Sequence, residues 1–259
     1  MMLPQQRKQH ILREIQQHGS AQVQELAEEL KVSAMTVRRD LAELEEAGLL
    51  SRIHGGAVPT ASSLEPSFTE KMALQADEKT DIAFAALEFV HDGQSLGFTA
   101  GTTCTRIAQE IAANETFRNL TVVTNSLSVA QEFYRVAESR TQGHRVILTG
   151  GEHTPSDALV GPVADTTIER LSLDLLFLGA HGANTKGLTS PNLDEARTNE
   201  TMTASAENVI AVFDHTKWGV PGLARFASWD EISAVVTTAE IPADARTFLT
   251  DSVERLVIA

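Results

Sequence analysis

The sequence predicts a small α+β domain over residues 1–58, a linker over 59–72 and a larger α/β domain over 73–259. Three observations support this division. The first 58 residues hold helix patterns and then a glycine-rich hairpin pattern. The stretch PTASSLEP at 59–66 is polar and flanked by prolines, as interdomain linkers often are. From Ala73 onward, short apolar strand patterns alternate with amphipathic helix patterns, which is typical of a mainly parallel sheet covered on both faces.

Two helices are predicted before the first cluster of cations. The first spans residues 4–18, with Ile11 among its apolar positions. The second begins near Val23, where VQELAEEL places apolar residues at i, i+3, i+4 and i+7. Lys31 and Val32 then form a turn short enough for the next helix to cross the second one, as in a helix–turn–helix.

A third helix is predicted from Ser33, whose hydroxyl can accept a hydrogen bond from an otherwise unpaired backbone N–H. Val37, Leu41 and Leu44 share one face of this helix and should be buried. The opposite face carries cations and small polar groups in the first turns and carboxylates in the last. That polarity suits a helix that enters a DNA groove with its N-terminal end first.

The segment after the third helix predicts a hairpin, because LLSRI and AV flank a His-Gly-Gly turn whose glycines permit positive φ. Three helices and this hairpin make a winged helix–turn–helix. A surface helix with a solvated charged face would explain the third helix alone, but the preceding helix and the hairpin favour DNA binding. The residues predicted to contact DNA lie on the exposed side of the third helix, in the turn before it or in the hairpin: Lys31, Ser33, Met35, Thr36, Arg38, Arg39, Arg52 and His54.

These residues have different expected roles. Arg38 and Arg39 would contact phosphates or guanine edges, while the hydroxyls and Lys31 would position the helix on the DNA backbone. Arg52 and His54 would reach flanking phosphates or the minor groove. Metal binding and catalysis are not expected in this domain.

Acidic charge is concentrated outside the small domain. The chain of 259 residues has a net charge of −14. Residues 1–60 hold seven Lys/Arg and eight Asp/Glu, so they carry −1 and the rest of the chain carries −13. A nearly neutral module with clustered cations predicts modest nonspecific affinity for DNA and a moderate salt dependence.

The composition is globular, with 42% hydrophobic and 22% charged residues. No apolar run reaches the roughly 18 residues of a membrane span, and the polar N-terminus shows no secretory signal. The single cysteine, Cys104, excludes an internal disulfide and fits a reducing compartment. A cytoplasmic location without a membrane partner is therefore expected.

The larger domain is predicted to contain seven strands and six helices. The strands are 94–98, 119–124, 145–149, 173–179, 208–213, 233–238 and 254–258. The helices are 78–90, 102–113, 126–138, 162–171, 194–206 and 242–250. Parallel sheets bind ligands at the carboxyl ends of their strands, so the loops after the strands are the candidate ligand site.

Glycines and polar groups follow these strands. Gly101 permits a tight turn, and Thr102 and Thr103 offer hydroxyl and N–H groups at a helix start, which suits a phosphate. An ordinary turn with a threonine cap is the alternative, and later strand ends also resemble caps and turns when taken singly. A parallel sheet would gather them at one edge, as a site for a polyhydroxylated anion. The predicted ligand-binding residues at this edge are Gly101, Thr102, Thr103, Asn125, Ser126, Gly151, His181, Gly182, Glu195 and Lys217.

Patterns for catalysis and cofactors are weak. His181 and Glu195 are the acid–base candidates, and no Ser-His-Asp order, HExxH or CxxC pattern occurs. Eight scattered histidines and one cysteine show no metal-ligand spacing, and no GxGxxG motif supports a dinucleotide. Cys104 lies near a helix start without an evident base and is interpreted as a packing residue. Catalytic residues, metals and cofactors are not predicted.

Motifs along nearly the whole chain point to one family. The N-terminal motif is ELAEELKVSAMTVRRDLAELEEAGLLSRIHGGAV. The larger domain adds AGTTCTRIA, LTVVTNSLSVA, LTGG, ALVGPVA, FLGAHGA, GLTSPNLDEA and FDHTKWG. Together these motifs resemble the DeoR family of bacterial sugar-metabolism regulators, and the first is similar to that family's winged-helix signature.

The resemblance implies a second domain related to ribose-5-phosphate isomerase and the glucosamine-phosphate deaminases. In these regulators that fold binds a phosphorylated sugar without turning it over. The resemblance also implies a homodimer or homotetramer on repeated half-sites of double-stranded operator DNA. The chain is therefore expected to be a DNA-binding transcriptional regulator, a repressor of carbohydrate-metabolism genes controlled by a sugar phosphate.

Two positions depart from the family pattern. Thr99 stands where the family usually has an aspartate, two residues before the glycine of GTT, and it is included in the predicted ligand site. His181 stands where GADG has its aspartate. Both changes remove a carboxylate that could bind sugar hydroxyls or move a proton, which argues against turnover. The alternatives are a sugar-phosphate isomerase or deaminase with an accessory DNA module, using Glu195 as its base, and a ligand-dependent activator.

Overall fold

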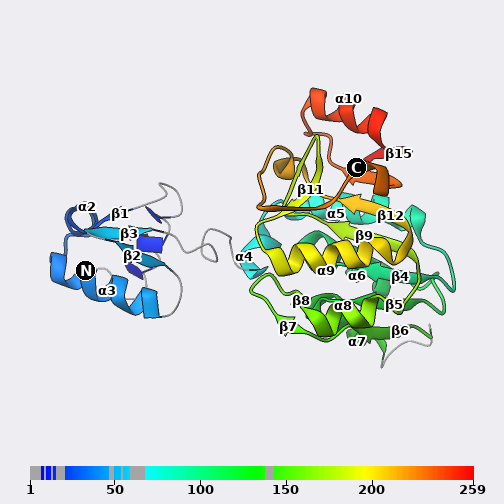
Figure 1. The fold of residues 1–259 in the computed structure, drawn as a ribbon, viewed down its shortest axis with the longest axis horizontal. Coiled ribbons are helices and arrows are strands. Elements are labelled where there is room, and N and C mark those ends of the chain that lie inside the picture. Colours follow the sequence, from blue (N-terminus) through cyan, green and yellow to red (C-terminus); the bar gives the residue numbers. More distant parts are fainter. Residues whose placement is uncertain are drawn as a thin grey trace. The chain divides into compact units, whose positions relative to one another are not determined.

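The structure is a computed structural model that describes residues 7–8, 10–12, 14–15, 21–46, 50–53, 55–58, 68–137 and 143–259. Two compact units, Met1–Ser67 and Phe68–Ala259, make up the chain (Figure 1). Helix α4 (Phe68–Ala73) begins the second unit, although its first residues fall within the predicted 59–72 linker. Residues 59–67 of that linker lie outside the described residues.

The first unit combines helices with a small antiparallel sheet. Helices α2 (Val23–Glu29) and α3 (Ala34–Glu46) match the second and third predicted helices. The described residues between 7 and 15 are helical, within the first predicted helix. Strands β2 (Ser51–Ile53) and β3 (Gly56–Val58) form the predicted hairpin, and β1 (Ala21–Gln22) adds an unpredicted third strand beside β3.

Glycines shape the hairpin in two different ways. Gly55 has φ +82°, a conformation that glycine adopts without strain. Gly56 has an ordinary φ, but a Cβ there would lie 2.3 Å from the carbonyl oxygen of Ala21. The close pairing of β3 with β1 therefore requires glycine at residue 56.

A seven-stranded parallel sheet forms the centre of the second unit. In spatial order its strands are β15 (Arg255–Ile258), β14 (Ala234–Thr237), β12 (Ala206–Val212), β9 (Leu173–Gly179), β4 (Ser95–Phe98), β5 (Thr121–Thr124) and β6 (Arg145–Leu148). All neighbours in this order run parallel. Phe98 is in register with both Thr124 and Phe177, so the loops after β4 and β5 start at the same level, and β9 extends two residues further, to Gly179.

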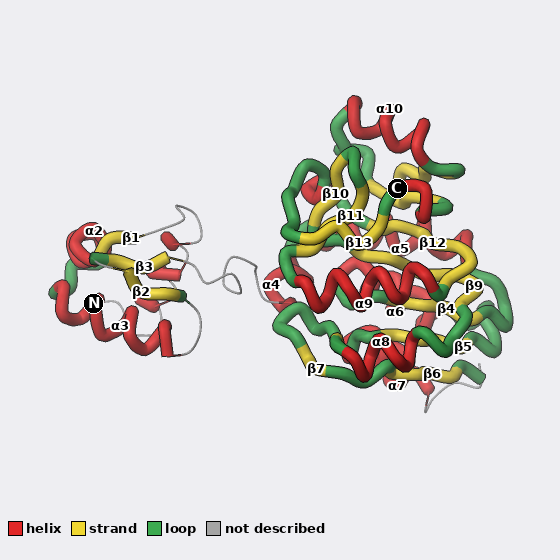
Figure 2. The backbone as a smooth tube through the Cα atoms, viewed as in Figure 1, coloured by secondary structure: helices red, strands yellow, loops and turns green. Residues whose placement is uncertain are grey.

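Helices cover both faces of this sheet (Figure 2). On one face lie α5 (Ala76–Ala86), α6 (Thr102–Ala113) and α7 (Leu127–Ala137), next to a short 3-10 turn, η1 (Leu87–Phe89). On the other lie α8 (Pro162–Ile168) and α9 (Leu193–Ala204), and α10 (Ala243–Ser252) contributes to the same core. The predicted fold class, a small α+β unit followed by a parallel α/β unit, is confirmed.

The sequence patterns did not predict several short elements. A two-stranded hairpin pairs β7 (Glu152–His153) with β8 (Leu159–Val160). A second antiparallel sheet contains β10 (Gly182–Asn184), β11 (Gly187–Ser190) and β13 (Ala224–Ala227). Two 3-10 turns, η2 (His215–Lys217) and η3 (Trp229–Glu231), complete the described elements of this unit. The missed strands lack the continuous apolar run by which the equally short strands of the parallel sheet were predicted.

Candidate functional site

The start of α3 is fixed by a side-chain cap and a buried face. Ser33 Oγ accepts a hydrogen bond from the Thr36 backbone N–H at 3.1 Å, as expected for an N-cap. Val37, Leu41 and Leu44 are 0%, 1% and 4% exposed, so the opposite side of the helix must face outward. This anchoring holds the predicted DNA-contact end of α3 in one orientation.

Cations and one large apolar side chain cover the outward side of α3. Met35 is 70% exposed, and Arg38 is also exposed. The exposed Arg39 donates from Nε to Glu43 Oε1 at 3.1 Å, one helical turn away. Lys8 binds the same carboxylate, and the two cations, Lys8 foremost, hold the pKa of Glu43 below its usual range.

A buried ion pair joins α3 to the N-terminal helical residues. Arg7 Nε lies 2.5 Å from Asp40 Oδ2, and Arg7 Nη2 lies 3.0 Å from Asp40 Oδ1. The two residues are only 8% and 4% exposed. The hydrogen bond to Asp40 raises the pKa of Arg7 despite its burial. This bidentate pair fixes α3 from its inner side, and the sequence analysis did not predict it.

The hairpin is tied to the far end of α3. Glu45 accepts a hydrogen bond from the Arg52 backbone N–H at 2.9 Å, and its other oxygen lies 3.7 Å from Arg52 Nη1. Arg52 remains exposed, as a DNA contact would require. Lys31, in the turn before α3, has φ +52° and is exposed. His54, the other predicted contact in the hairpin, lies outside the described residues.

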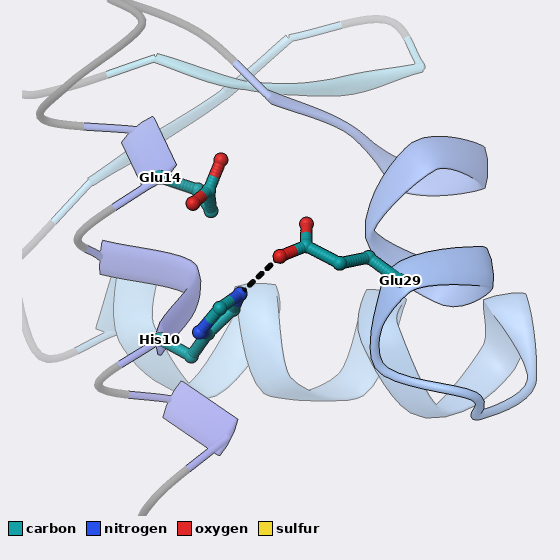
Figure 3. A group of neighbouring side chains, drawn as sticks. All are labelled: His10, Glu14 and Glu29. Carbon is teal, nitrogen blue, oxygen red and sulfur yellow. Dashed lines mark hydrogen bonds and ion pairs between the residues drawn. The ribbon is translucent and has the colours of Figure 1, made fainter.

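A polar group joins the N-terminal helical residues to α2 (Figure 3). His10 Nε2 lies 2.6 Å from Glu29 Oε1, and one ligand-type atom from each of His10, Glu14 and Glu29 lies within 4.8 Å of the others. An imidazole and two carboxylates form a donor set that divalent ions accept. The hydrogen bond between His10 and Glu29 accounts for their approach without an ion.

In the second unit, the loop after β4 contains a buried threonine, Thr99, followed by a half-buried turn at Gly101. Thr99 is fully buried, and its Oγ1 accepts a hydrogen bond from the Gly179 N–H at 2.9 Å. Gly101 is the N-cap of α6 with φ +137°, and it offers no side-chain hydrogen bond to the first turn. Thr102 and Thr103 follow, each 8% exposed. The first turn of α6 has no side-chain cap, and helix starts of this kind are where backbone N–H groups bind anions.

Asn125 and Ser126 are engaged within the protein. Asn125 Oδ1 accepts from the Ala100 N–H at 3.0 Å, and its Nδ2 donates to the Leu159 carbonyl at 3.2 Å. Ser126 Oγ donates to Asp157 Oδ2 at 2.6 Å and accepts from the Val129 N–H at 3.1 Å. Both side chains are fully buried, so they position the loops around the candidate site from within.

Two of the predicted glycines permit close backbone contacts. A Cβ on Gly151 would lie 2.5 Å from the Val160 carbonyl oxygen, and one on Gly182 would lie 2.1 Å from that of Val220. Glu195 is held by the β7–β8 hairpin, because Thr154 Oγ1 donates to its Oε1 at 2.7 Å. The half-buried His181 lies at the end of β9, in the same edge of the sheet.

Lys217 ends η2, directly after β12, and is half-buried. Asp214, 1% exposed, caps this turn by accepting from the Thr216 N–H at 3.0 Å. Next to it, Glu78 Oε2 accepts from Thr238 Oγ1 at 3.0 Å and lies 2.8 Å from His215 Nδ1. These bonds join α5 to the loops after β12 and β14.

No motif in the sequence singled out Glu78 or its neighbour Lys79 as a site residue. Lys79 is 5% exposed, and its Nζ donates to the backbone carbonyls of Lys71 and Leu74. One signal was present: Lys79 shares a helical face with the apolar Ile82. Glu78, Asp214 and His215 also lie within 4.8 Å of one another, but Lys79 and Lys217 place positive charge beside them, which disfavours a cation.

These observations define a class of protein: a winged helix–turn–helix unit with exposed arginines in the first turns of α3, followed in the chain by a parallel α/β unit. Residues 7–62 match the family described as "DeoR-like helix-turn-helix domain", and residues 74–239 match "DeoR C terminal sensor domain". The chain belongs to the DeoR family of transcriptional regulators.

Relatives match along nearly their whole length. The HTH-type transcriptional regulator GlpR of Haloferax volcanii is 38% identical over 248 residues, covering 95% of this chain and 94% of that protein. The glycerol-3-phosphate regulon repressor of Escherichia coli (strain K12) is 34% identical over 248 residues and 95% of both chains. The chain is thus a regulator, and the alternative of an isomerase or deaminase with an accessory DNA module is not supported.

Among solved structures, D-ribose-5-phosphate isomerase in complex with phospho-erythronic acid matches with a TM-score of 0.41 and 13% identity, over 55% of this chain and 54% of that chain. That likeness is too slight to bear on function. In the described part of the chain, no helix has the length and apolar character needed to cross a membrane.

Proposed function

We propose that this regulator binds duplex operator DNA through α3 and the β2–β3 hairpin and represses genes of carbohydrate metabolism. A phosphorylated sugar or polyol, bound at the carboxyl edge of the parallel sheet, controls its DNA affinity. The observation that carries the DNA-binding part is the start of α3. Its inner face is buried and joined to Arg7, while Met35, Arg38 and Arg39 are exposed.

Arg38 is proposed as the principal base contact, since its guanidinium can bind guanine edges bidentately. Arg39 is proposed to contact phosphate or a base edge after exchanging its bond to Glu43. Ser33, Thr36, Lys31, Arg52 and His54 are proposed to position the unit on the DNA backbone. A single winged helix binds weakly, so a homodimer or homotetramer on repeated half-sites is proposed to supply operator affinity.

The proposed effector site favours an anionic ligand. The first turn of α6 has no side-chain cap, and Lys217 supplies a half-buried cation after β12. Asn125, Ser126, Gly151 and Gly182 support the surrounding loops, whereas His181 and Glu195 are proposed to bind hydroxyls. The name of the Escherichia coli relative makes glycerol 3-phosphate the first compound to test.

The test is a fluorescence-anisotropy titration of the full chain on DNA from upstream of its own gene and on a shuffled DNA. We expect binding about 10³-fold tighter to the upstream DNA. Among glycerol 3-phosphate, ribose 5-phosphate, fructose 1-phosphate and inorganic phosphate, at least one should change that affinity about 5- to 150-fold.

Lys217→Ala should abolish the response to the active compound while leaving DNA affinity unchanged. The exposed Lys186→Ala, in the β10–β11 turn, is the matched control and should retain the response. Equal affinity for both DNAs would overturn the proposed DNA function. A reporter gene behind the upstream DNA separates repression from activation.

A further inference from the structure

Lys79 is a buried cation in an apolar face. It lies in the first turns of α5, where Ile82, Ala83 and Ala86 are each fully buried. The side chain is itself 5% exposed. An ammonium group in such surroundings is costly unless hydrogen bonds compensate for its lost hydration. Its partners therefore indicate what Lys79 does.

Those partners belong to the end of α4. Lys79 Nζ donates to the carbonyl oxygens of Lys71 and Leu74, which lie in the last turn of α4 and directly after it. The last carbonyls of a helix lack partners within the helix and attract cations. Lys79 thus caps α4 from the neighbouring helix. In the chain, α4 is the first element after residues 59–67, which connect the two units.

Helix α5 also contacts the turn that carries Lys217, because Oε2 of Glu78, the residue before Lys79, lies 2.8 Å from Nδ1 of His215 in η2. Burial lowers the pKa of Lys79, the nearby Asp214 opposes that change, and Lys217 reinforces it. Asp214 caps the turn that carries Lys217. A negative charge bound beside Lys217 would therefore also attract Lys79. The two carbonyls of α4 and an anion then compete for one ammonium group.

We propose that Lys79 is a positioning residue that couples the effector site to α4. Without an anion, its ammonium holds the end of α4. An anion beside Lys217 draws the ammonium away and loosens the C-terminal end of α4, a six-residue helix whose N-terminal end follows the segment that leads to the DNA-binding unit. This coupling rests on the proposed effector site, but the holding of α4 by Lys79 does not.

Hydrogen exchange of the full chain, followed by mass spectrometry, tests the holding step without ligand or DNA. In Lys79→Met, which preserves the length and apolar packing of the side chain, amides in residues 68–75 should exchange about tenfold faster than in the wild type. Lys79→Arg keeps the charge and the donors and should exchange nearly as slowly as the wild type. The exposed Lys186→Met should have no effect. Unchanged exchange in Lys79→Met, with the fold intact elsewhere in the sheet, would overturn the proposal.

The coupling step is tested with inorganic phosphate at up to about 0.1 M against chloride of equal ionic strength. Phosphate should slow exchange at residues 101–105 and speed it at 68–75, and in Lys79→Met the second effect should vanish. Slowing at 101–105 without any change at 68–75 would refute the coupling alone. No effect at either segment would refute the anion site and the coupling together. Neither result depends on whether the protein recognises its operator.

Discussion

Single polar side chains in this regulator are buried where they join separate segments of the chain. Asn125 links the loops after β4 and β5 to β8 through both ends of its amide. Thr99 accepts a hydrogen bond from the Gly179 N–H at the end of β9 and so joins β4 to β9. Residue types alone indicated a ligand site here, but they could not separate the groups that support its loops from those that face a ligand.

Cys104 is the residue whose chemistry the structure defines most sharply. Its thiol is fully buried, and burial raises its pKa to about 11. Only the thiolate reacts readily, so the native protein should resist a thiol reagent such as DTNB at pH 8, whereas urea-unfolded protein should react at once. The raised pKa also means that the thiol favours folding at lower pH and that this contribution is lost as pH rises from about 9 through about 11. Rapid labelling of the native protein at pH 8 would show that Cys104 is accessible.

At the scale of elements, the sequence predicted the large regular parts and missed the small paired ones. The seven strands of the parallel sheet were predicted because each is a short apolar run between turn residues. Strands β7 and β10 were not, because two or three residues are too few to show a strand pattern, although each pairs with the next strand along the chain. Strand β1 was missed because it depends on pairing with the distant β3, and the contact of Arg7 with Asp40 was missed for the same reason.

The buried pair between Arg7 and Asp40 makes α3 depend on the N-terminal helical residues. Asp40→Asn leaves the guanidinium buried without its counter-ion, and we expect it to destabilise the first unit by about 3 kcal/mol. Hydrogen exchange of α3 amides measures this loss in the full chain. Glu28→Gln, an exposed change on α2, should leave α3 unaffected. Equal protection of α3 in wild type and Asp40→Asn would show that the pair does not hold the helix.

At the scale of the whole molecule, charge and chemistry are divided between the two units. The DNA-binding unit is nearly neutral, with Arg38 and Arg39 exposed in the first turns of α3 and Arg52 exposed in the hairpin, and nearly all of the net charge of −14 lies in the sensor unit. An acidic sensor unit adds no attraction to DNA, so we expect recognition to depend on the few cations of α3 and the hairpin.

The effects of effector binding and operator binding on each other must be reciprocal. If an effector weakens operator binding by a given factor, saturating operator DNA must weaken effector binding by the same factor. Isothermal titration of the active compound into protein with and without operator DNA measures this second factor. Agreement between the two factors is expected. An effector affinity that DNA leaves unchanged would mean that the compound acts on something other than the operator complex.

The account depends most on the claim that the exposed start of α3 recognises DNA sequence. The most direct measurement compares Arg38→Ala with the wild type on the upstream DNA and on its shuffled counterpart, at two salt concentrations. Loss of a bidentate guanine contact should weaken upstream binding by about 1–3 kcal/mol and shuffled binding much less. Equal weakening on both DNAs would make Arg38 a phosphate contact. No weakening on either DNA would contradict the central claim.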